Sequence, residues 1–108
     1  MSQHPTVVLH VSDRPEDVGR SIGSASTLHK ARPDAIIRII VNGGAIVGLT
    51  LGAAPIEMPT FATVEACEVG MRSRGISVDA LQPGVVTTAS AIVALADAQL
   101  GGAAYVRI

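Results

Sequence analysis

The chain has 108 residues, of which 48% are hydrophobic, and a formal net charge of −1. This length fits one domain, residues 1–108, built around one core. The near-neutral charge and the presence of only two aromatic residues argue against nucleic acid as a partner, and no apolar stretch approaches the length of a membrane span.

Composition also bears on compartment and assembly. Residues 1–5 lack the basic and apolar regions of a signal peptide, and one cysteine cannot form an internal disulfide. We therefore expect a cytoplasmic protein. A core of Ile, Val, Leu and many Ala buries little area per residue, so we expect contacts between identical subunits to supplement it.

Strand and helix signals alternate through the first 41 residues. Thr6–Val11 is a β-branched, apolar run typical of a strand covered on both faces. Residues 13–16 resemble a capping box, and apolar residues then recur at helical spacing until the helix ends before Pro33. Residues 35–41 form the second predicted strand.

A polar and glycine-rich segment follows the second strand. Asn42, Gly43 and Gly44 can cradle an anion on backbone N–H groups. A tight turn is the simpler interpretation, and we favour it because neither a phosphate-loop motif nor a dinucleotide fingerprint follows. Residues 45–51 suit a short helix, whereas two prolines make residues 52–60 a loop.

The second half continues the alternation. The same signals predict strands over residues 61–66, 85–88 and 103–108, helices over 67–74 and 89–100, and a single turn over 77–81. Gly75 suits a left-handed helix end, and Thr88 or Ser90 can cap the last helix. That helix is apolar nearly all round, which predicts that it is covered on more than one side.

This order predicts an α/β fold in which a mostly parallel five-stranded sheet carries helices on both faces. Chemistry in such sheets gathers at the carboxyl ends of the strands. His10, Asn42 and Cys67 are all predicted at that edge.

Cys67 is the only cysteine, and it lies where a predicted strand meets a helix. Backbone N–H groups at a helix start carry partial positive charge that favours a thiolate, while the nearby Glu65 and Glu68 oppose it. A lone cysteine is also commonly a small, packed hydrophobic residue. Both interpretations stay open, and the exposure of Cys67 distinguishes them.

Several segments carry a family resemblance. In chain order they are Val64-Glu65-Ala66-Cys67, Met71-Arg72-Ser73-Arg74-Gly75-Ile76, Leu81-Gln82-Pro83-Gly84-Val85, Ala98-Gln99-Leu100-Gly101 and Ala104-Tyr105-Val106. They resemble the second half of the DsrE/DsrF-like (DsrE/TusD-type sulfur-relay) family.

The resemblance implies a flavodoxin-like three-layer sandwich. It also implies that Cys67 carries sulfane sulfur as a persulfide, received from a donor protein and passed to an acceptor, in a homotrimer or homohexamer. Some family subunits are structural and lack an active cysteine. This chain departs from the family where it has Asn42 in place of a usual histidine, and in its shorter 52–60 segment.

Other chemistries are less well supported. Cys67, His4, His10 and His29 have no metal-ligand spacing, so we expect neither a metal nor a cofactor. A cysteine hydrolase needs a base, for which His10 is the one histidine at the right edge, although a hydrogen-bonded strand-end residue is the simpler reading. The alternative function is a non-catalytic oligomer subunit, or a small-ligand or anion-binding module, with a packed cysteine.

Overall fold

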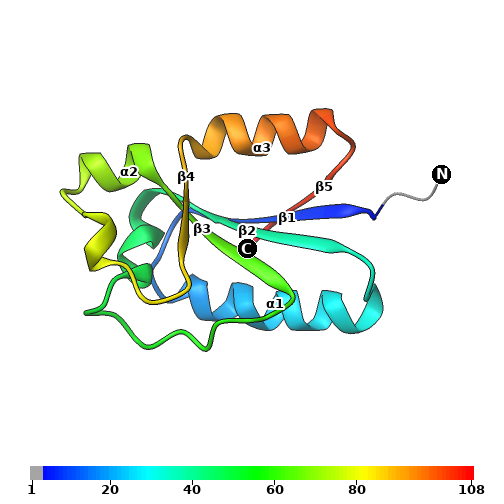
Figure 1. Ribbon diagram of the computed structural model, residues 1–108, viewed down its shortest axis with the longest axis horizontal. Helices are drawn as coiled ribbons and strands as arrows, with labels where there is room; N and C mark the ends of the chain where they lie inside the picture. Colours follow the sequence, from blue (N-terminus) through cyan, green and yellow to red (C-terminus); the bar gives the residue numbers. More distant parts are fainter. Residues whose placement is uncertain (1–3) are drawn as a thin grey trace.

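The computed structural model describes residues 4–108 (Figure 1). The elements, in chain order, are β1 (Thr6–Val11), α1 (Asp17–Ala31), β2 (Ile36–Val41), the 3-10 helix η1 (Gly43–Leu49), β3 (Ala62–Cys67), α2 (Glu68–Ser73), the 3-10 turn η2 (Val78–Ala80), β4 (Val86–Thr88), α3 (Ala91–Leu100) and β5 (Ala104–Arg107). In this part of the chain, no helix combines the length and apolar character needed to cross a membrane.

All five strands are parallel, in the order β4-β3-β2-β1-β5. Helix α1 packs on one face of the sheet, while α2 and α3 lie on the other (Figure 1). The predicted α/β fold with helices on both faces is therefore confirmed, and its arrangement is that of a flavodoxin-like sandwich. Parallel strands require such covered faces, because each connection must cross over the sheet.

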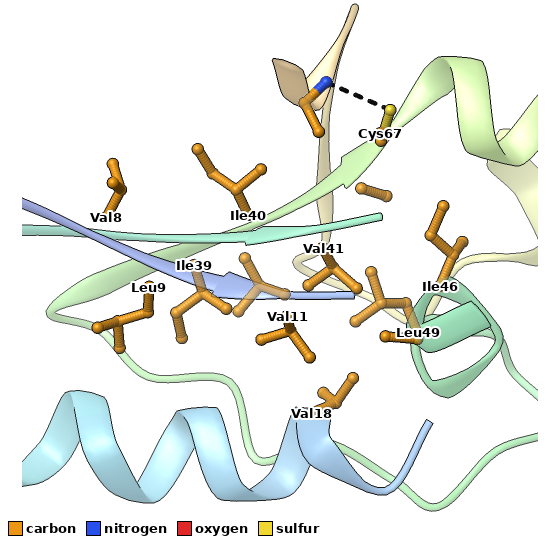
Figure 2. Close-up of a cluster of buried hydrophobic side chains, with 14 of the residues drawn as sticks. Val8, Leu9, Val11, Val18, Ile39, Ile40, Val41, Ile46, Leu49 and Cys67 are labelled. Atoms are coloured by element: carbon orange, nitrogen blue, oxygen red, sulfur yellow. Dashed lines mark hydrogen bonds between the residues drawn. The ribbon is translucent and has the colours of Figure 1, made fainter. Parts of the chain in front are cut away.

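The core occupies both faces of the three central strands. β2 reads Ile-Ile-Arg-Ile-Ile-Val, the nearly continuous apolar run of a strand buried on both sides. Figure 2 shows Val8 and Ile40 on the same side of the sheet as Cys67, whereas Leu9 and Val11 lie on the other side, which faces α1. The alternation of side chains along each strand thus builds two apolar layers from one set of strands.

The predicted element boundaries are mostly correct to within two residues. Gly75 adopts a φ of 65°, the left-handed helix end predicted for it, and the Ser90 hydroxyl caps α3 by accepting a hydrogen bond from the Val93 N–H. Residues 52–60 form a loop, as expected.

The predicted capping box at residues 13–16 is wrong. Helix α1 begins at Asp17, and Glu16 occupies its N-cap position without a capping side-chain hydrogen bond. The Asp13 side chain instead accepts hydrogen bonds from Ser12 and from Arg107 at the end of β5. A long-range ion pair therefore replaces the local contact that the sequence pattern favoured.

One ion pair lies among the apolar residues of the α3 face. Arg38 of β2 donates two hydrogen bonds of 2.8 Å to the carboxylate of Glu65 on β3, and Thr63 donates a third. Burial alone would raise the pKa of Glu65, but these hydrogen bonds and the charge of Arg38 outweigh it and hold that pKa below its ordinary value. The pair lets a charged residue occupy the middle of a buried strand.

Replacing Arg38 by leucine should leave the buried Glu65 carboxylate without a charged partner. We expect this to lower the free energy of unfolding by about 2 to 3 kcal/mol at pH 7. Because the pKa of Glu65 is lowered by folding, the ion pair stabilises the native protein above the ordinary carboxyl pKa and loses this effect as the pH falls through the folded-state value. The cost of Arg38→Leu should therefore shrink near pH 4, as measured by urea denaturation at both pH values.

The double variant Arg38→Leu/Glu65→Leu is the control for this prediction. It removes both charges from the same face of the sheet and should recover most of the lost stability. Equal free energies of unfolding for the single and double variants at pH 7 would contradict the prediction, because they would show that Glu65 without Arg38 does not destabilise the fold.

Candidate functional site

Cys67 lies at the junction of three elements. It is the last residue of β3 and the N-cap of α2, and its Sγ accepts a hydrogen bond of 3.3 Å from the backbone N–H of Ala91, the first residue of α3 (Figure 2). The prediction of a cysteine at a strand end beside a helix start is thus confirmed. A backbone donor aimed at sulfur stabilises negative charge on that atom.

The start of α3 is placed over Cys67 by the sheet itself. Thr88, the last residue of β4, pairs with Cys67, so the chain leaves the sheet beside the sulfur. Ser90 then caps α3 and directs the first helical N–H groups back toward β3. As a result Cys67 is only 5% exposed. Exposure is the property that distinguishes a reactive from a packed cysteine, and this burial agrees with the packed interpretation.

The two acidic neighbours of Cys67 have other partners. Glu68 accepts a hydrogen bond of 2.7 Å from the Thr87 hydroxyl on β4, and Glu65 forms an ion pair with Arg38. Glu65 and Cys67 lie on the same face of β3 two residues apart, but the carboxylate charge of Glu65 is compensated locally. Both carboxylates are therefore engaged by side chains other than Cys67.

His10, at the carboxyl end of β1, is held by two side chains. Its Nε2 lies 2.8 Å from Oδ1 of Asn42, and its Nδ1 lies 2.6 Å from the hydroxyl of Tyr105 on β5. An amide oxygen only accepts, so Nε2 carries the proton, and Nδ1 accepts from the Tyr105 hydroxyl in the neutral ring. The expectation of a hydrogen-bonded strand-end histidine fits this arrangement.

The strand register brings Asn42 beside Cys67. Val41, the last residue of β2, pairs with Ala66, and Asn42 and Cys67 follow these two residues directly, so both lie at the carboxyl edge of the sheet. The predicted edge cluster therefore assembles, with Asn42 between the histidine and the cysteine. No hydrogen bond joins His10 to Cys67 within residues 4–108, and the base and nucleophile pair of a cysteine hydrolase is not formed.

Gly43 and Gly44 are explained by close packing. A Cβ at Gly43 would lie 2.5 Å from the Ser12 carbonyl oxygen, and one at Gly44 would lie 2.9 Å from that of Asp13. Gly43 also has a φ of 58°, which favours glycine. The tight turn between β2 and η1 accounts for both residues without a bound anion.

Two residues of the site were not predicted from the sequence. Tyr105 stood only in a family motif, although the sole tyrosine of the chain on a strand predicted to join the sheet is a reasonable hydrogen-bond partner for His10. Ala91 contributes its backbone alone, which no residue type can signal. In the described part of the chain, no three His, Cys, Asp or Glu side chains converge as metal ligands.

Comparisons with known proteins support the fold. No protein-family model matches the chain, and no curated protein matches it significantly. Among solved structures, MTH1491 from Methanobacterium thermoautotrophicum, a protein of unknown function, superimposes with a TM-score of 0.82 at 19% identity. The YchN protein from E. coli gives a TM-score of 0.74 at 20% identity. In each case the match covers 98% of this chain and 100% of the other, so the whole domain has the fold of these two proteins.

Proposed function

We propose that this protein is a cytoplasmic sulfur carrier that holds sulfane sulfur as a persulfide on Cys67 and passes it to a partner protein. The observation that carries the proposal is the Ala91 N–H directed at the Cys67 sulfur at the carboxyl edge of a parallel sheet. The DsrE/DsrF-like resemblance of the segments around Cys67 supports it.

The chemistry requires one sulfur atom with a stabilised negative charge. The Cys67 thiolate attacks the outer sulfur of a donor persulfide, the donor's S–S bond breaks, and the donor cysteine leaves as a thiolate. An acceptor thiolate then attacks the outer sulfur of the Cys67 persulfide. The S–S bond breaks, and Cys67 leaves as a thiolate. No net oxidation occurs in either step, so no redox cofactor is needed.

The burial of Cys67 favours a second candidate function. At 5% exposure the side chain packs like a core residue, as in a structural subunit whose cysteine is never modified. Sulfur transfer requires that the start of α3 move away from Cys67, either by local opening or on contact with a partner. The two candidates differ in whether the folded protein reacts at this sulfur.

A small persulfide donor should add one sulfur atom to the folded protein. Intact-protein mass spectrometry should detect the added sulfur, which a reductant removes and which Cys67→Ser lacks. The variant should still fold, at a cost of about 1 kcal/mol for altering a buried side chain. A native protein whose Cys67 resists both the donor and a small alkylating reagent would support the structural-subunit function instead.

Loosening the first turn of α3 should expose Cys67. Ser90→Ala removes the side-chain cap, which is worth about 1 kcal/mol, and should raise the alkylation rate of native Cys67 about fivefold. Ser77 supplies the matched control, because it precedes η2 without a capping hydrogen bond. Ser77→Ala should leave the alkylation rate of Cys67 unchanged. Equal alkylation rates in the two variants would contradict the idea that the first turn of α3 controls access to Cys67.

The proposal includes a homotrimer or a homohexamer. On the outer surface of α3, Ile92 is 72% exposed and Leu100 is 85% exposed, more apolar area than a monomer usually leaves in water. We infer that this helix packs against a second copy of the chain.

Light scattering at micromolar concentration should therefore give a multiple of the monomer mass. The Ile92→Lys variant should give a smaller mass than the unmodified protein. Val78→Lys is the control, since Val78 is similarly exposed but lies on η2, away from α3. A monomer mass for the unmodified protein would contradict the assembly.

A further inference from the structure

A cavity of about 630 Å³ lies on the opposite side of the sheet from Cys67. It is bounded by the first half of α1, by η1 and by residues 53–57 of the following loop, which passes beside α1 in Figure 1. Its largest apolar side chains are Val18, Ile22, Val47, Pro55 and Ile56. This volume and lining are typical of pockets that bury a small organic molecule.

The loop that closes the cavity is fixed by Gln82, a buried polar residue. Its amide group donates to the carbonyls of Thr50 and Ala54, at 2.9 and 3.0 Å, and accepts from the Ile56 N–H at 2.8 Å. These three hydrogen bonds cross-link the loop to the segment that precedes β4. The wall of the cavity is therefore preformed, which lowers the entropic cost of binding a ligand.

The charged residues that line the cavity are all acidic. Glu16 and Glu57 contribute carboxylates, and no Lys, Arg or His is among the lining residues. Neither carboxylate forms an ion pair or side-chain hydrogen bond within residues 4–108. The neighbouring Arg14 and Arg20 are both directed to the buried Asp17, at 3.3 and 3.2 Å. Two solvent-exposed carboxylates thus flank an apolar cavity, and Glu16 also interacts with the charge of Arg14 without forming an ion pair with it.

We propose that this cavity binds a small amphipathic cation, in which an aliphatic or aromatic body carries a protonated amine. The body fills the apolar walls, and the ammonium group lies near Glu16 and Glu57. An anion of the same shape meets repulsion, and a neutral analogue gains the apolar contacts alone.

Gly19 gives this proposal a precise test. It lies on α1 in the cavity lining, and a Cβ built there has no neighbouring heavy atom within 4 Å. Gly23, one turn further along α1, has equally open surroundings but does not line the cavity. Leucine at either position should be accommodated without a clash and should improve helix propensity, yet only Gly19→Leu should occupy the site.

The experiment titrates 4-phenylbutylamine into the ¹⁵N-labelled full-length protein, followed by amide chemical shifts. Binding should have a Kd on the order of 1 mM or tighter, and the shifts should concentrate in α1, η1 and residues 53–57. Gly19→Leu should abolish them and Gly23→Leu should retain them. Glu16→Gln/Glu57→Gln should weaken binding about fivefold.

Two analogues of the same length test the charge preference. 4-Phenylbutanol should bind less tightly than the amine, and 4-phenylbutanoate should bind least. Equal affinity for amine and alcohol would overturn the cation preference, and unchanged binding in Gly19→Leu would overturn the site. Cys67→Ser should leave amine binding intact, because its side chain lies on the other face of the sheet, so this proposal and the sulfur-carrier function succeed or fail separately.

Discussion

The parallel direction of all five strands is the constraint on which the rest of the structure depends. Parallel neighbours cannot be joined by tight hairpins, so each connection crosses a face of the sheet and both faces become covered. The central strands must then be apolar on both sides, and a charged residue such as Arg38 is accommodated only with a buried partner, Glu65. The same constraint brings every strand's carboxyl end to one edge, where His10, Asn42 and Cys67 meet.

The register of β4 on β3 determines the environment of Cys67. Thr88 pairs with Cys67, and α3 begins three residues later, so the helix start falls on the sulfur. This contact supplies a hydrogen bond and also excludes solvent from the thiol. The hydrogen bond to the sulfur and the exclusion of solvent from it therefore come from the same turn of chain, so access to Cys67 depends on how readily the first turn of α3 opens.

Patterns that are local in sequence predicted the fold well. Continuous apolar runs located the strands, Ser90 marked a helix start, and Gly75 marked a helix end. The misassigned capping box at residues 13–16 shows the limit, because Asp13 is bound by Arg107 from the other end of the chain. At the site, sequence placed Cys67, His10 and Asn42 at one edge, but the burial of Cys67 under a backbone N–H depends on strand register, which no residue pattern specifies.

The two faces of the sheet carry different features. Side chains alternate along a strand, so Cys67 projects under α3, while the cavity beside α1 is formed by η1 and the loop that Gln82 fixes. The loop over residues 52–60 passes beside α1, and its residues 53–57 line the cavity on that face of the sheet. Gln82 also connects this loop to the segment that leads into β4, and β4 in turn places the helix start that covers the sulfur.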